Sequence, residues 1–161
     1  MHAKSSGGLI IYFSLFITMC LNILPWSNQI AILMPNWTLL TLLYWSIALP
    51  HKVSIGTGWT TGLLFDVLTG SMLGQNTLIF SIAAYFGHQF YSRIRNNRIW
   101  QQAIFIVFFF LFLQLLSLWI SQLNNQLNVG YQYWLQAITS GICWPIMFAI
   151  LRLSRRRFRV Q

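Results

Sequence analysis

Apolar runs separated by short polar links make up most of this chain. A helix that crosses a membrane needs about 20 residues, with a usual range of roughly 17 to 25. The first and fourth runs reach that length only when flanking Ser, Gly and Tyr residues are added. Because a backbone in lipid must satisfy its own hydrogen bonds, such runs favour helices. The pattern predicts six spanning helices, over residues 9–24, 30–49, 55–73, 77–90, 99–123 and 134–153.

The third run, residues 55–73, is the most polar of the six, since it contains four glycines and Asp66. Hydropathy alone would reject it and leave five spans. The positions of the basic residues decide in favour of six. Without the third span, Lys52 could no longer share a side of the membrane with the cluster from Arg93 to Arg98 and the carboxyl-terminal arginines.

All ten Lys and Arg residues fall in four clusters at the ends of apolar runs, and the links halfway between clusters carry no charge. Each interval between clusters is long enough for the chain to cross a bilayer and return. The positive-inside rule then predicts that both termini are cytoplasmic. The clusters are Lys4; Lys52; Arg93, Arg95 and Arg98; and Arg152, Arg155, Arg156, Arg157 and Arg159.

Composition supports this class of protein. The chain is 57% hydrophobic and 7% charged, whereas a soluble domain averages about 25% charged residues. We therefore expect an all-α integral membrane protein: one transmembrane domain over residues 1–161, folded as a compact six-helix bundle. The net charge of +9 could indicate nucleic acid, but cations at the ends of apolar runs are typical of anchors to anionic lipid. We expect no nucleic-acid partner.

The basic clusters are expected to contact lipid headgroups, and a contact with a cytoplasmic protein is the alternative. The residues assigned to headgroup contact are Lys52, Arg93, Arg95, Arg98, Arg155, Arg156 and Arg157.

Small residues and one acid recur at every fourth position of the third run. Residues four apart share one face of a helix, and small-xxx-small pairs let another helix approach closely. The pattern predicts that the third helix is the central packing helix, and that its acid faces protein. This face could serve the bundle itself, a homo-oligomer, a partner or a ligand. It consists of Gly58, Gly62, Asp66, Gly70 and Gly74.

Asp66 is the only acidic residue of the chain. A charge in mid-membrane costs roughly 2.5 to 3.5 kcal/mol on insertion scales. His88, about one turn nearer the cytoplasm, is the nearest ionisable candidate for a partner. Otherwise we expect a protonated acid, or one hydrogen bonded to Ser and Thr groups. A structural role is favoured over ion or ligand contact, so Asp66→Asn should cost less than Gly62→Leu or Gly70→Leu.

Pro35 and Asn36 open the second run. Proline suits the first turn of a helix, where a missing N–H costs nothing, so a helix start is favoured. The alternative is a helix break within the membrane that exposes backbone polar groups beside Asp66.

Catalytic chemistry finds little support, because one carboxylate cannot form a general acid and base pair. His2, His51 and His88 are scattered and have no metal-ligand spacing with the two cysteines. No nucleophile, base and orienting group can be assembled from neighbouring motifs. We therefore expect a protein that is not an enzyme and that holds no metal or cofactor.

Several motifs are shared with one bacterial family. They are Pro35-Asn36-Trp37, Leu43-Tyr44-Trp45, Ala48-Leu49-Pro50-His51, Gly56-Thr57-Gly58 and the stretch from Gly62 to Gly74. In these residues the chain resembles MreD, the rod-shape-determining protein of the bacterial inner membrane. The resemblance is strongest over residues 35–85, and its most specific part is the Gly-xxx-Asp-xxx-Gly-xxx-Gly pattern.

The resemblance implies a multi-pass inner-membrane protein of the cell-wall elongation machinery without catalytic activity. It implies MreC as direct partner, bound through its transmembrane helix, with the third span as the first candidate for the contact. Indirect partners would be MreB, the peptidoglycan synthase RodA and its transpeptidase. The family is also similar in fold to the membrane substrate-binding subunits of energy-coupling-factor transporters. Because of that similarity, an alternative function stays open: the chain would be a small-ligand or lipid binding protein, or a transporter component, with a pocket near Asp66.

Overall fold

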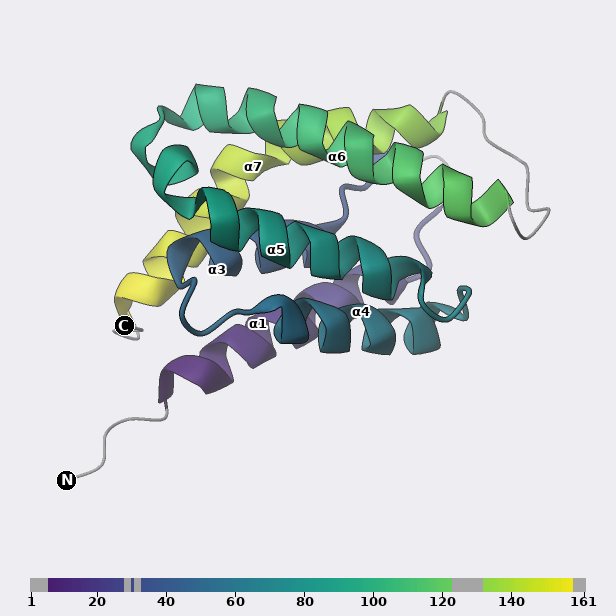
Figure 1. The fold of residues 1–161 in the computed structure, drawn as a ribbon, viewed down its shortest axis with the longest axis horizontal. Coiled ribbons are helices and arrows are strands. Elements are labelled where there is room, and N and C mark those ends of the chain that lie inside the picture. The colour runs from purple at the N-terminus through teal and green to yellow at the C-terminus, as the bar shows by residue number, and fades with distance from the viewer. Residues whose placement is uncertain (1–5, 28–29, 31–32, 123–131, 158–161) are drawn as a thin grey trace.

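The computed structural model describes residues 6–27, 30, 33–122 and 132–157. These described residues form six helices with assigned bounds, labelled as in Figure 1. They are α1 (Ser6–Ile23), α3 (Trp37–Ala48), α4 (Ile55–Thr69), α5 (Gln75–Asn96), α6 (Ile99–Gln122) and α7 (Gln132–Arg157).

Each helix falls on one of the predicted apolar runs, but several bounds differ. The second run was expected over 30–49, whereas α3 begins only at Trp37 and has 12 residues. The fourth was expected over 77–90, whereas α5 has 22 residues. α6 and α7 are long and apolar enough to cross a membrane. α3 is about 18 Å long at 1.5 Å per residue, so six full crossings remain a prediction.

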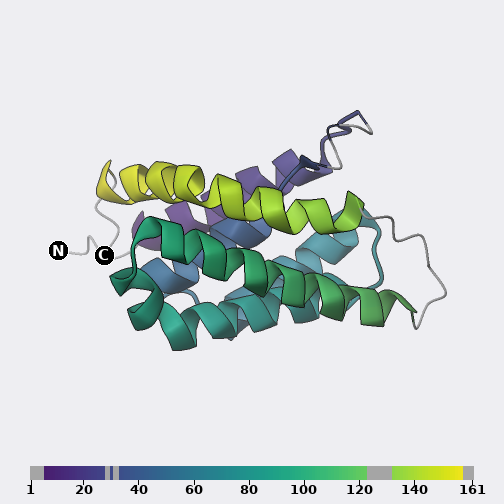
Figure 2. The same ribbon diagram turned by 90° about the horizontal axis from the view of Figure 1, so that it is seen from above.

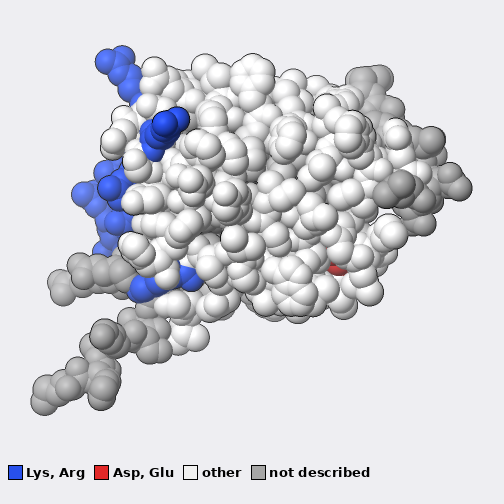
Figure 3. Space-filling view, in the orientation of Figure 1, with Lys and Arg blue, Asp and Glu red and all other residues white. Residues whose placement is uncertain are grey.

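The bundle has two distinct ends, because successive helices run in opposite directions (Figures 1 and 2). The first turn of α1, the last turn of α7 and the turn between α5 and α6 lie at one end. Figure 3 shows the Lys and Arg side chains of the visible face gathered there, so we call it the basic end. The turn between α4 and α5 lies towards the other end, next to Asp66 in the last part of α4, and we call this the Asp66 end.

The central helix is α3, which packs against α1, α5 and α7. All ten residues from Thr38 to Ile47 are buried. The expectation that the third run forms the central helix is therefore wrong. α4 lies at the side of the bundle and leaves Leu64 and Val67 exposed. The physical reason is that α3 is apolar around its whole circumference and so needs a neighbour on each side.

α4 and α5 approach each other closely at Gly58 and Gly62. A Cβ atom built on Gly58 would lie 2.6 Å from the Phe80 carbonyl oxygen, and one on Gly62 would lie 2.5 Å from Thr77 Cα. Both distances are far below van der Waals contact, so neither position has room for a side chain. These two glycines serve the interior of the bundle, as small-xxx-small pairs commonly do.

Gly70 and Gly74 do not continue that face, because α4 ends at Thr69. Their φ angles are 65° and 104°, in the left-handed region that favours glycine. Gly70 ends α4 in the αL conformation common after a helix, and Gly74 directly precedes α5. A Cβ at either position would meet nothing within 4 Å. The expected helix contact at these two residues is wrong, since both shape the turn.

Substitution at Gly62 tests the α4–α5 contact. We expect Gly62→Ala to lower the free energy of unfolding by about 1–3 kcal/mol, because the added methyl forces two backbones apart. Gly56→Ala is the matched control on the same helix, where a Cβ would lie 3.6 Å from Ser54 Oγ, an ordinary contact. It should leave stability unchanged or raise it by up to about 1 kcal/mol, because alanine favours a helix over glycine. Denaturant unfolding in detergent measures both, and equal stability of the two variants would contradict the proposed contact.

Candidate functional site

The Asp66 carboxylate is fully buried and accepts six hydrogen bonds. Oδ1 accepts from Ser71 Oγ at 2.8 Å and from the side chain and backbone nitrogens of Asn76 at 2.9 and 3.0 Å. Oδ2 accepts from Thr77 Oγ1 at 2.7 Å and from the backbone N–H groups of Gly74 and Thr77 at 2.9 and 3.1 Å. The expected hydrogen bonds to Ser and Thr hydroxyls are confirmed.

This carboxylate caps the amino terminus of α5 from a neighbouring helix. The first N–H groups of any helix lack partners within the helix, and Asp66 accepts three such groups, from Gly74, Asn76 and Thr77. Negative charge is also favoured at that end of the helix dipole. An acceptor-only carboxylate suits six donors, so Asp66 holds the α4–α5 turn together.

The considered pairing of Asp66 with His88 is wrong. The ring nitrogen Nδ1 of His88 lies 3.0 Å from the carbonyl oxygen of Pro50, which belongs to the α3–α4 link at the basic end. Within the described residues, the partners of Asp66 all come from the α4–α5 turn and the start of α5.

Asn36 starts α3, as predicted, whereas Pro35 precedes this N-cap residue and does not lie in the first turn of the helix. The Oδ1 atom of Asn36 accepts from the backbone N–H of Leu39 at 3.1 Å. Asn22, from α1, donates to Asn36 Oδ1 at 3.4 Å and to Thr38 Oγ1 at 2.7 Å. The first turn of α3 is thereby joined to the end of α1.

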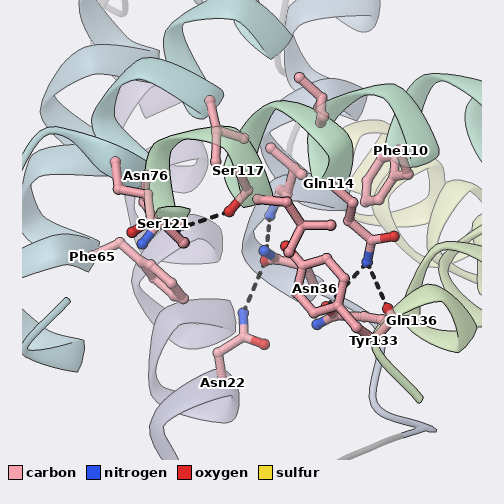
Figure 4. Close-up of a pocket in the computed structure, with 15 residues that line it drawn as sticks. Asn22, Asn36, Phe65, Asn76, Phe110, Gln114, Ser117, Ser121, Tyr133 and Gln136 are labelled. Atoms are coloured by element: carbon pink, nitrogen blue, oxygen red, sulfur yellow. Dashed lines mark hydrogen bonds between the residues drawn. The ribbon is translucent and has the colours of Figure 1, made fainter. Parts of the chain in front are cut away.

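A cavity of about 420 Å³ lies beside the Asp66 turn, among residues of α1, α3, α4, α5, α6 and α7 (Figure 4). Asn76 belongs to both features, since it donates to Asp66 and also lines the cavity. No ionisable Lys, Arg, His, Asp or Glu is among the described lining residues, which combine amides, hydroxyls and aromatic rings. The carboxamides are Asn22, Asn36, Gln75, Asn76, Gln114 and Gln136.

Gln114 is the most informative residue of this cavity, because one of its atoms lacks a partner. The side chain is only 8% exposed, and its Nε2 donates to the Tyr133 carbonyl at 3.1 Å and to Gln136 Oε1 at 3.4 Å. Its Oε1 is buried with no hydrogen-bond partner in the described part of the chain. An unsatisfied buried acceptor costs about 1–3 kcal/mol, so this oxygen is a ready acceptor for a bound donor.

The sequence predicted a pocket near Asp66 only as an alternative, and of the lining residues it singled out only Asn36. The other polar residues were missed because they are spread over several helices and share no motif. A usable signal existed in the fifth run, where Gln114 interrupts an otherwise apolar stretch. Polar residues inside membrane segments commonly mark a functional cavity or a network.

The residues predicted to contact headgroups belong to the basic end, where the Lys and Arg side chains gather in Figure 3, whereas the cavity lies beside the partners of Asp66. Arg93, Arg95, Arg98 and Arg157 are exposed, whereas Arg155 is half-buried. The structure therefore separates an uncharged polar region at one end of the bundle from a cationic region at the other.

Comparison with known proteins gives a consistent result. The family model described as "rod shape-determining protein MreD" matches residues 4–154. The rod shape-determining protein MreD of Haemophilus influenzae is 35% identical over 148 residues, which cover 90% of this chain and 90% of that protein. No solved structure matches this chain.

Replacing Asp66 tests the role of its carboxylate. Asp66→Asn keeps the volume but turns one acceptor oxygen into a donor that faces other donors. We expect it to lower the free energy of unfolding by about 1–3 kcal/mol or more. From the sequence alone, in contrast, this substitution was expected to be well tolerated. Ser71→Ala removes only one of the six donors and should cost about 1 kcal/mol. Denaturant unfolding compares them, and an Asp66→Asn protein more stable than Ser71→Ala would refute this role.

Proposed function

The chain belongs to the MreD family of rod shape-determining proteins, and we propose that it is a non-catalytic membrane component of the cell-wall elongation machinery. In this proposal it binds the transmembrane helix of MreC. Through MreC it tunes the peptidoglycan synthesis of RodA and its transpeptidase, in coordination with MreB. Family membership supports a role in cell shape, and the apolar surface of the helices supports a role exerted in the membrane.

We propose that the basic end faces the cytoplasm of a bacterium and that the bundle spans its inner membrane. Within the described ranges, Lys and Arg occur only near the carboxyl ends of α5 and α7 or in links at the basic end, and Asp66 is the only charged residue towards the other end. The positive-inside rule supports a cytoplasmic location for such an end.

The contact with MreC needs a surface that the bundle leaves uncovered. The space beside Gly58 and Gly62 is filled by α5. The glycine face of the third run is therefore not available as the contact site for MreC. An apolar groove of about 610 Å³ runs along α1 instead. Its walls carry Leu9, Phe13 and Ile17, which are 70%, 66% and 43% exposed, and its floor includes the fully buried Trp45.

This groove is the observation that carries the proposal. Trp45 Nε1 donates to Ser14 Oγ at 2.8 Å, which fixes the floor of the groove to α1 and satisfies its polar atoms. Apart from Ser154 of α7, the remaining lining consists of the apolar and aromatic side chains of α1. Association of helices in lipid is driven by close packing, because lipid tails are as apolar as the helices. A single apolar helix such as that of MreC matches this shape and chemistry.

Cysteine cross-linking in cells tests the groove and its orientation together. In a background without Cys20 and Cys143, Phe13→Cys should form disulfides with every third or fourth position of the MreC membrane helix, as one helix face requires. Leu9→Cys should react nearer the cytoplasmic end of that helix, and Ile17→Cys nearer its periplasmic end.

Phe108→Cys provides the matched control, since Phe108 lies on α6 and is 67% exposed like Phe13. It should give no such periodic cross-links. Equal cross-linking at Phe108 would contradict the groove as the specific binding site of MreC. The opposite order for Leu9 and Ile17 would contradict the cytoplasmic position of the basic end.

The cavity supports a second candidate function, a small-ligand or lipid binding protein or transporter component. Ligand sites commonly occupy about 300–1,000 Å³ and combine apolar walls with a few polar groups, and this cavity fits both properties. Because a buried charge without a partner is costly, the lining favours an uncharged ligand group with a donor for Gln114 Oε1. The pocket expected near Asp66 would then be formed by the neighbours of Asp66, such as Asn76 and Phe65.

Mass spectrometry of the protein extracted from native membranes tests this candidate. We expect an uncharged molecule or headgroup to co-purify with the wild type and to be lost in Gln114→Leu. Gln101→Leu is the control, because Gln101 is exposed on the same helix, and it should retain the ligand. Absence of any bound molecule from the wild type would argue against a ligand site, and equal retention in Gln114→Leu would remove Gln114 from it.

A further inference from the structure

A second cavity, of about 320 Å³, lies at the basic end between α3, α5 and α7. Four arginines from two helices line it: Arg95 from α5, and Arg152, Arg155 and Arg156 from α7. We call it the arginine cleft. Arg152 was not among the residues expected to contact headgroups, because sequence clusters alone do not reveal which side chains converge.

Within the described residues, no Asp or Glu side chain pairs with the arginines of this cleft. Asp66 is the only acidic residue of the sequence, and it is buried at the other end with six hydrogen bonds of its own. Guanidinium groups gathered around one cavity repel each other, and an anion bound among them relieves that repulsion. The planar fork of arginine matches phosphate oxygens in a bidentate geometry.

The cleft is partly preorganised by Tyr44. This residue is buried, its ring packs edge to face with Phe148 at a centroid distance of 5.5 Å, and it lines the cleft together with Arg155. Arg155 is half-buried, unlike the exposed Arg93 and Arg157. A cation that is already half-buried loses less side-chain freedom on binding an anion than a fully exposed surface arginine does.

The remaining lining residues are apolar: Ile47, Ala48 and Phe148. A cationic rim above an apolar wall suits an amphiphile better than a soluble anion. Basic pockets between membrane helices commonly hold phosphate headgroups of anionic lipids. We propose that the arginine cleft binds the phosphate of an anionic lipid, with the headgroup among Arg95, Arg152, Arg155 and Arg156 and the acyl chains along the apolar helices.

Lipid titration of the purified full chain tests this site. Native mass spectrometry in detergent would compare phosphatidylglycerol and cardiolipin with zwitterionic phosphatidylcholine, and a separate arm would add inorganic phosphate or pyrophosphate. We expect one anionic lipid to bind about tenfold or more tightly than phosphatidylcholine, since charge-assisted hydrogen bonds are strong. Stronger binding of inorganic phosphate or pyrophosphate than of anionic lipid would overturn the lipid assignment.

Two double variants with the same change in net charge distinguish a cleft from a diffuse basic surface. Arg152→Gln/Arg155→Gln should weaken binding of the anionic lipid about tenfold or more. Arg93→Gln/Arg157→Gln changes two exposed arginines outside the cleft and should weaken it less than about threefold, because screened surface charges contribute little. Equal losses in the two variants would overturn the proposal, as would wild-type binding with no preference for anionic lipid.

Folding is checked by the unfolding midpoint without added lipid. If the double variant in the cleft unfolds, the exposed Arg152→Gln alone replaces it, with Arg157→Gln as its control on the same helix. The single change in the cleft should still weaken lipid binding more than its control does. Equal binding by these two single variants would overturn the proposal.

Discussion

The buried carboxylate of Asp66 sets the geometry of the α4–α5 hairpin. Six donors from the turn and from the start of α5 converge on its two oxygens. The capped helix must then begin beside the end of α4, and the two helices meet along Gly58 and Gly62, where only glycine fits. α5 also packs on the central helix α3. The position of Asp66 therefore also determines how α5 is placed against the core.

The distribution of the remaining polar groups gives the two ends of the bundle different chemistry. At the Asp66 end, amides and hydroxyls satisfy one another across helices, as Gln75 does by donating to Ser117 and Ser121 at 2.9 and 3.0 Å. At the basic end, the described arginines have no Asp or Glu side chain to pair with. One end is therefore suited to neutral hydrogen-bonding groups and the other to anions. A bundle built in this way is polar along its axis, which agrees with a fixed orientation in a membrane.

Sequence periodicity predicted the helices because apolar runs of this length have few other solutions. It also predicted that Asp66 is buried and that Asn36 starts a helix. It failed at Gly70 and Gly74, since a repeat of four residues cannot distinguish a helix face from a turn that needs positive φ. It also did not predict that α3 is the central helix, because burial on every side depends on how the other helices assemble around it. The cavity around Gln114 and the arginine cleft depend on which distant helices become neighbours, and no local pattern encodes that.

The way in which glycines are used restricts where a partner can bind. Gly58 and Gly62 have no space left beside α5, and Gly87 and Gly141 are closely approached by Ser46 and Val107 in the same way. The sites of closest helix approach in the described bundle are thus already occupied internally. A partner helix must therefore rely on larger apolar side chains in a preformed groove, and the exposed Leu9, Tyr12 and Phe13 of α1 have this character. Recognition would then depend on the shape of the groove, which α3 fixes through the buried Trp45 beneath it.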